Sequence, residues 1–264
     1  MKSIRGKLFL WILPALIGAL ALLISFSTLI FRDTIYSERK LKQKHVVETA
    51  ISVISHYYNL AKAGKMSETD AKEAAKLAVK SLRYETVEYF WINDDKLPYP
   101  TMVMHATNPA LDGKVLDDPK YNCATLMETW TDKKITKTDG KKNLFQAAVE
   151  VANKDANGGF VQYLWPKPKP DGTLTTESYP KLSFVKKFQP WGWIVGSGVY
   201  IDDVQRTFMN KLFGLLIIGT ITIAAAVVVF LFFSRSLSKP IKSLADRALA
   251  FGKGDLTVKF EAKG

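Results

Sequence analysis

Cysteine, histidine and the usual catalytic motifs are scarce in this 264-residue chain. Cys123 is the sole cysteine, which excludes an intramolecular disulfide and a cysteine-based metal cluster. The three histidines, His45, His56 and His105, stand far apart in the sequence. No HExxH, GxSxG or phosphate-loop motif is present, and adjacent acids on a strand or turn point away from each other. We therefore expect no enzymatic activity, no cofactor and no metal site.

Charged residues are missing from two long blocks, residues 8–31 and residues 212–233. Each block exceeds the roughly 20 apolar residues that a membrane-spanning helix needs. Basic residues precede the first block and follow the second, so the positive-inside rule predicts two cytoplasmic termini and an extracytoplasmic segment over residues 32–211. Because much of the net charge of +12 follows this pattern, we attribute it to inner-membrane topology and not to nucleic-acid binding.

The first apolar block has an alternative interpretation as a secretory signal. Signal cores usually contain about 7 to 15 apolar residues followed by a small-x-small cleavage site. Here the apolar run is longer and continues into Arg32 and Asp33 without such a site. Pro14 and Gly18 are compatible with a spanning helix. We therefore expect an uncleaved anchor.

Helical patterns precede strand patterns in the outer segment. Apolar residues spaced by three, four and seven predict an amphipathic helix from the first block to Gly64, and Ser67 with Asp70 resembles a capping box that opens a second helix. Five period-two runs follow, at residues 89–93, 101–105, 160–165, 181–188 and 193–200. We expect a lysine-rich surface insertion over residues 132–142, a short helix over 143–152 and a proline-rich connection over 166–176. The pattern predicts an α+β fold with a five-stranded, mostly antiparallel sheet.

The last two strands form a predicted hairpin that leads towards the membrane. Pro190 and Gly192 mark its turn, and its second strand runs into Asp202 and Asp203, which suit a helix N-terminus. We therefore interpret the hairpin as a lever, with Lys181 at one end and Asp202-Asp203 at the transmembrane end. A register shift of one residue would turn Lys181 to solvent.

Polar-tipped aromatic and cationic residues gather in or beside these strands. Aromatic walls with one or two cationic or hydroxyl donors suit a small carboxylate, which arginine binds through two hydrogen bonds and lysine as a point charge. The competing interpretation makes the aromatics core residues and the cations solvated. The candidate ligand-binding residues are Arg83, Tyr84, Tyr89, Trp91, His105, Tyr163, Trp165 and Lys181.

Several ordered blocks resemble one known family. They are Arg83-Tyr84, YFWIND from Tyr89, MVMH from Met102, NPxLxGK from Asn108, YxWPKP from Tyr163, KLSFV from Lys181 and WGWIVGSGVYIDD from Trp191. Over roughly residues 35–205 the chain resembles the single Cache domain, second type, of bacterial methyl-accepting chemotaxis receptors, and residues 238–255 resemble the first half of a HAMP linker.

The resemblance implies a PAS-like antiparallel sheet packed on a long N-terminal helix, a homodimer formed through residues 34–61, and recognition of acetate, propionate, pyruvate or lactate. It implies that Arg83, Tyr84, Tyr89, Trp91, His105, Tyr163 and Lys181 line the pocket. The chain departs from the family pattern at Ala106, at Phe184, at Tyr99-Pro100 and in a longer insertion over residues 133–142. Phe184 replaces a common tyrosine, and we expect the lost hydroxyl to favour a more apolar acid.

The resemblance predicts the sensing half of a transmembrane chemoreceptor. Its expected parts are a cytoplasmic N-terminus over residues 1–7, spans over 8–31 and 212–233, a sensor over 32–211 and a partial HAMP linker over 234–264. In the family a cytoplasmic part regulates the chemotaxis kinase and adaptor, and we expect the given residues, which end at Gly264, to be either a fragment or a truncated product without that part. Two alternatives remain, namely the sensor of a histidine kinase or nucleotide cyclase, and a membrane-tethered interaction protein without ligand.

Overall fold

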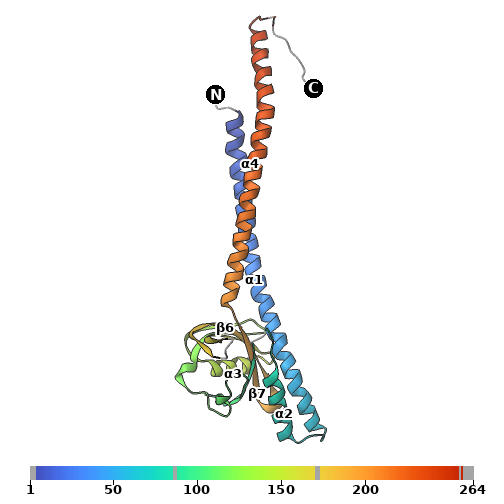
Figure 1. Cartoon of the computed structure of the whole chain (residues 1–264), viewed down its shortest axis with the longest axis vertical. Coiled ribbons are helices and arrows are strands. Elements are labelled where there is room, and N and C mark those ends of the chain that lie inside the picture. The colour runs from blue at the N-terminus through green and yellow to red at the C-terminus, as the bar shows by residue number, and fades with distance from the viewer. Residues whose placement is uncertain (1–3, 86–87, 170–172, 256, 258–264) are drawn as a thin grey trace. The chain divides into compact units, whose positions relative to one another are not determined.

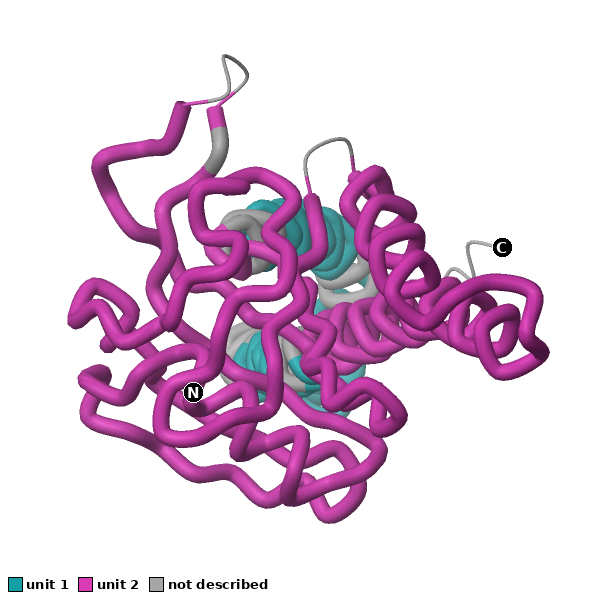
Figure 2. Tube along the Cα trace, turned by 90° about the horizontal axis from the view of Figure 1, so that it is seen from below, with its two compact units in different colours: residues 1–33, 207–264 teal, residues 34–206 magenta. Residues whose placement is uncertain are grey.

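The computed structural model describes residues 4–85, 88–169, 173–255 and 257 of the chain. It contains two compact units, Met1–Asp33 with Thr207–Gly264, and Thr34–Arg206 (Figure 2). We call the first the helical unit and the second the sensor unit. Each is considered separately below.

Two long helices enter the helical unit. Helix α1 (Ile4–Lys62) is continuous into the sensor unit, as the sequence predicts, and α4 (Asp202–Gly252) begins at the predicted acidic pair. Within α4, Phe208–Phe232 is the one segment of the described residues that is long and apolar enough to cross a membrane, whereas the apolar stretch of α1, Ile17–Ser27, is shorter. Helix α4 continues without interruption through Pro240, which lies in the stretch that resembles a HAMP linker.

The sensor unit contains an antiparallel sheet that includes the labelled strands β6 and β7 (Figure 1). The order of its strands is β2-β1-β7-β6-β5-β3-β4. The predicted number of five strands is wrong, because the sheet has seven. Short 3-10 turns lie at Pro109–Leu111, Pro119–Tyr121 and Gln189–Trp191. The strands are β1 (Phe90–Asp94), β2 (Met102–His105), β3 (Asn122–Thr129), β4 (Ile135–Asn143), β5 (Gly159–Pro168), β6 (Leu174–Phe188) and β7 (Trp193–Tyr200).

The two strands missing from the prediction lack the period-two pattern. β4 coincides with the predicted lysine-rich insertion, and most of its side chains are exposed, as an edge strand allows. β3 shifts register around Ala124 and Leu126, which interrupts its alternation of buried and exposed side chains. The other five strands lie where they were predicted, within a few residues at their ends, apart from an early start of β6 at Leu174.

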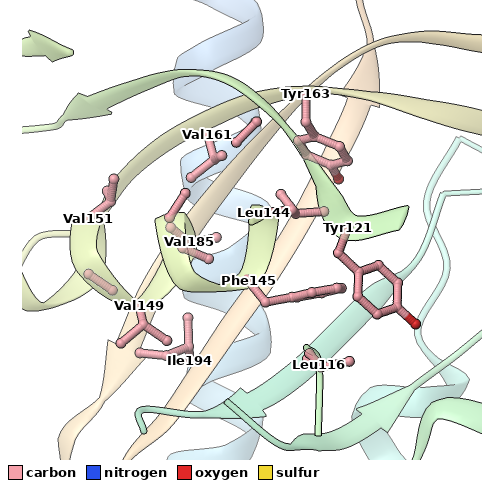
Figure 3. Close-up of a cluster of buried hydrophobic side chains, with 14 of the residues drawn as sticks. Leu116, Tyr121, Leu144, Phe145, Val149, Val151, Val161, Tyr163, Val185 and Ile194 are labelled. Atoms are coloured by element: carbon pink, nitrogen blue, oxygen red, sulfur yellow. The ribbon is translucent and has the colours of Figure 1, made fainter. Parts of the chain in front are cut away.

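Helices cover both faces of the sheet. One face packs on α1 and on α2 (Glu68–Ser81), through a cluster that includes Ile54, Val79 and Phe184. The other face packs on α3 (Leu144–Lys154), where Phe145 lies edge-to-face with Tyr121 at 5.2 Å between ring centroids (Figure 3). We call these the α1 face and the α3 face. Every residue of β7 is buried because this strand lies inside the sheet and is covered on both faces.

The N-cap of α3 is a buried asparagine with three bonds to the backbone. Asn143 Oδ1 accepts from the amides of Phe145 and Gln146, at 2.9 and 3.1 Å, and its Nδ2 donates to the carbonyl of Leu116 at 2.8 Å. Asn143→Ala leaves these groups unpaired, so we expect a loss of about 2 kcal/mol of stability in denaturant unfolding. Ser67→Ala, at the exposed N-cap of α2, should cost about 1 kcal/mol or less. If Asn143→Ala and Ser67→Ala lower the stability equally, the hydrogen bond from Asn143 to the Leu116 carbonyl does not add to the stability.

A glycine in β7 makes room for an aromatic ring of β1. A Cβ at Gly196 would lie 2.2 Å from Cζ2 of Trp91, whose Nε1 is held by the Oδ1 of Asn93 at 3.0 Å. Gly196→Ala must displace this ring, and we expect it to cost about 1–3 kcal/mol. Thermal unfolding followed by tryptophan fluorescence measures the loss. Gly252→Ala, where the added Cβ meets nothing within 4 Å, is the control and should change little.

Candidate functional site

Alternate side chains of β6 face opposite sides of the sheet, and this determines where Lys181 lies. Ser183 Oγ meets the hydroxyl of Tyr163 on the α3 face at 2.8 Å. Lys186 pairs with Glu48 of α1 at 2.9 Å on the opposite face. Lys181 shares the parity of Ser183, so its side chain enters the α3 face.

Phe184 lies on the α1 face, with the opposite parity. Its ring packs on Phe160 at 5.0 Å and on Trp130 at 6.1 Å between centroids. The sheet separates this ring from Lys181, and the expected effect of the missing hydroxyl on ligand preference stays a prediction.

Lys181 is a buried cation between two aromatic rings. Only 2% of the residue is exposed, and its Nζ lies 4.6 Å from the ring centroid of Tyr89 and 4.4 Å from that of Tyr200. Both distances suit a cation–π contact, which gains strength when the cation is desolvated. Tyr200 is directly opposite Lys181 in the hairpin register.

Glu88 is the carboxylate partner of this cation. Its Oε2 lies 3.3 Å from Lys181 Nζ, and 6% of the residue is exposed. Burial raises the pKa of the Glu88 carboxyl above its ordinary value, and the charge of Lys181 opposes that rise. The buried pair has no net charge.

His105 of β2 adds a neutral imidazole to the same group. Its ring centroid is 5.1 Å from that of Tyr89, and its Nδ1 accepts the backbone N–H of Asn108 at 3.0 Å. Because Nδ1 is an acceptor, the ring proton is on Nε2. Burial, together with the charge of Lys181, lowers the pKa of His105 to about 3.

Tyr163 and the two tryptophans, Trp91 and Trp165, lie on the α3 face of the sheet. Tyr163 is paired with Lys181 in the register of β5 and β6, and burial raises the pKa of its hydroxyl. Trp165 lies edge-to-face with Tyr163 at 5.9 Å and stacks on Tyr121 at 6.4 Å. Trp91 packs edge-to-face on Phe145 at 6.4 Å, and its N–H is already bonded to Asn93, so it serves as core.

Two predicted site residues lie apart from this group. Arg83 is exposed, and its Nη1 donates to the carbonyls of Lys80 and Leu82 at the end of α2, at 2.6 and 2.7 Å. The hydroxyl of Tyr84 bonds to Gln43 of α1 at 2.8 Å and to Ser197 at 2.7 Å. The Tyr84 ring packs on the α1 face.

An ion pair connects the group to the start of α4. Lys167 Nζ lies 2.6 Å from Asp202 Oδ2 and 5.0 Å from the ring centroid of Tyr200. The Tyr200 hydroxyl donates to the carbonyl of Pro166 at 2.6 Å. Asp202 is the first residue of α4, so Tyr200 touches the Lys181 group while lying two positions before that helix.

Sequence reasoning missed Glu88 and Tyr200 for different reasons. Glu88 precedes β1 and forms an isolated bridge with Tyr84, so no strand periodicity indicates where its side chain points. Tyr200 was available to prediction, because pairing outward from the turn at Phe188 and Trp193 places it opposite Lys181.

The group around Lys181 thus contains one buried cation with a carboxylate, two tyrosine rings, a buried tyrosine hydroxyl and a neutral imidazole. Such a group can hold a small anion through charge and hydrogen bonds.

The chain resembles a known protein family and two curated proteins. Residues 24–214 match the model of the Cache domain family. The chain is 34% identical over 270 residues to the methyl-accepting chemotaxis protein McpP of Pseudomonas putida, covering all of this chain and 44% of that protein. It is 29% identical over 174 residues to the sensor histidine kinase MctS of Rhizobium johnstonii, covering 66% of this chain and 31% of that protein. The chain thus spans less than half the length of these relatives.

Two solved structures resemble the sensor part. A periplasmic sensor domain of a chemotaxis protein is 40% identical with a TM-score of 0.50, covering 63% of this chain and 98% of that domain. A Cache chemosensory domain described for carboxylic acid recognition is 36% identical with a TM-score of 0.50, covering 64% and 98%. With the family match extending over most of its length, the chain belongs to the Cache domain family.

Proposed function

We propose that the sensor unit binds a short monocarboxylate beside Lys181 and acts as the sensing half of a chemotaxis receptor. The observation that carries this proposal is the buried ammonium of Lys181, held between the rings of Tyr89 and Tyr200. A buried cation gains most from an anion that can also accept hydrogen bonds. The relative described for carboxylic acid recognition supports this ligand class.

The surrounding groups suit a small acid with a short apolar part. His105 offers an Nε2–H, and Tyr163 offers a hydroxyl that is shared with Ser183. The aromatic rings provide apolar walls for the alkyl end. Acetate, propionate, pyruvate and lactate have this combination, and the site binds them through Lys181, Tyr89, His105, Tyr163 and Tyr200.

The signal passes from the end of β7 to α4. A ligand that displaces Tyr200 or the Lys167–Asp202 pair changes the first turn of α4, directly after β7. The effect is limited by the difference in ligand affinity between the two states, typically about 1–3 kcal/mol. We infer two spans over residues 8–31 and 212–233, cytoplasmic termini, a HAMP linker from residue 234 and a homodimer through residues 34–61.

Thermal unfolding of the full chain in lipid nanodiscs tests the proposed ligand class. We expect acetate, propionate, pyruvate or lactate to stabilise the sensor unit, by about 2.7 kcal/mol at a concentration 100 times the dissociation constant. Methylammonium chloride at the same ionic strength is the control and should give no shift. If none of the four acids stabilises the chain, the interaction protein without ligand becomes the better hypothesis.

A histidine kinase sensor is the second candidate, because one relative of this chain is a sensor histidine kinase. The same ligand site suits a chemotaxis receptor and a histidine kinase, since α4 would transmit the signal in both. Fusing the chain to the cytoplasmic part of each relative and measuring ligand-dependent kinase activity distinguishes them. Regulation in only one fusion identifies the output geometry that α4 supports.

A further inference from the structure

The charges around Lys181 are already balanced before any ligand enters. Lys181 pairs with Glu88, and the nearby Lys167 pairs with Asp202. His105 is neutral because burial keeps its pKa far below 7. A carboxylate that binds beside Lys181 therefore gives this buried group a net negative charge unless a proton enters with it.

Burying an unpaired charge is costly, and two carboxylates that share one cation do not both stay ionised. The titratable groups that interact electrostatically with Glu88 are Lys181 from β6, Lys167 from β5, Tyr200 from β7, and Tyr84 and Glu85 from the segment after α2. Lys181 and Lys167 favour the ionised form of Glu88, whereas Glu85 opposes it. A second carboxylate at Lys181 adds to that opposition and takes a share of the cation that holds Glu88 ionised.

We propose that each carboxylate ligand binds together with one proton from solvent, held by the carboxyl pair that the ligand forms with Glu88 beside Lys181. Glu88 then contributes to the ligand specificity of the site. A carboxylate can share a proton with Glu88 and is favoured, whereas an anion that cannot take up a proton is disfavoured. This inference rests on the proposed function of the Lys181 site.

Glu88 is better placed than His105 to take up this proton. The Nδ1 of His105 already accepts the N–H of Asn108 at 3.0 Å, so protonating it removes a hydrogen bond inside the fold. The cation of Lys181 also repels a charge on His105. Protonation of Glu88 instead removes one of two competing negative charges.

Calorimetric titration of the full chain in nanodiscs with propionate measures this proton directly. In buffers of different ionisation enthalpy at pH 7, we expect uptake of close to one proton per propionate bound. The apparent affinity should fall about tenfold for each unit of pH between 6 and 8, as one linked proton requires. Glu88→Gln should reduce the uptake to near zero and make the affinity independent of pH. Glu85→Gln, which changes an exposed acid, should keep the proton uptake.

Three results would overturn the inference. Propionate binding without proton uptake by the wild-type chain refutes it while the proposed function stands. Proton uptake that persists in Glu88→Gln assigns the proton to another group, such as His105. Absence of binding for acetate, propionate, pyruvate and lactate refutes both the inference and the proposed function. If Glu88→Gln does not fold, the wild-type titrations alone decide the first and third cases.

Discussion

Replacing Lys181 with methionine is expected to weaken propionate binding by at least about 100-fold, or about 2.7 kcal/mol. The substitution removes the buried ammonium between Tyr89 and Tyr200 and keeps a side chain of similar length. Loss of one partner from a buried, hydrogen-bonded charge pair costs about 2–5 kcal/mol in binding. Calorimetric titration of the full chain in nanodiscs at pH 6 provides the measurement.

Two controls separate ligand binding from folding. Lys181→Met leaves Glu88 as an unpaired buried carboxylate, so the double variant with Glu88→Gln tests binding without that charge. We expect the double variant to fold and to bind propionate as weakly as the single variant. Arg83→Ala should keep wild-type affinity within about twofold, because its guanidinium is exposed and bonded to the end of α2. If the double variant binds propionate with the affinity of the wild-type chain, Lys181 does not belong to the ligand site.

Acidification from pH 7 to pH 5 is expected to cost the sensor unit about 2 kcal/mol of stability through His105 alone. The pKa of this imidazole falls from 6.5 in the unfolded chain to about 3 in the folded chain. The unfolded chain therefore binds more protons below pH 6.5, so stability is complete above that pH and is lost as pH falls towards 3. The loss reaches about 5 kcal/mol at the acidic end.

A matched variant isolates this contribution. In His105→Asn the side-chain oxygen can accept the N–H of Asn108, as Nδ1 does, but the side chain does not titrate. The pKa of Glu88 is raised by burial, so above pH 4.5 acidification increases the contribution of this group to stability, opposite to the effect of His105. Since both chains contain Glu88, the difference in unfolding free energy between them reports on His105. A difference that is independent of pH between 5 and 7 would contradict a buried neutral imidazole.

Elements with regular periodicity were predictable from the sequence. Ser67 accepts from the amide of Asp70 at 3.1 Å, as the capping box predicts. The turn at Gly192 has a left-handed backbone with φ of 62°, and β6 and β7 pair across it as expected. These features depend on neighbouring residues, which is why local patterns indicate them.

Contacts between distant segments were harder to predict. Lys181 and Glu88 are 93 positions apart, and the residue before a strand has no fixed side-chain direction. Tyr84 was assigned to the ligand site by resemblance, and Phe184 was expected to influence ligand preference, yet both pack against the α1 face. The motif blocks identify residues near the sheet, whereas the pairing of strands decides which face each side chain occupies.

The alternation along β6 separates two kinds of evolutionary constraint within one strand. Lys181 and Ser183 face the candidate ligand, while Phe184 and Lys186 hold the sheet against α1. Substitutions at the first pair can therefore change ligand choice without altering the helix contact, and substitutions at the second pair can adjust that contact without touching the ligand. A receptor built on this strand can acquire a new chemical preference while keeping its connection to the rest of the chain.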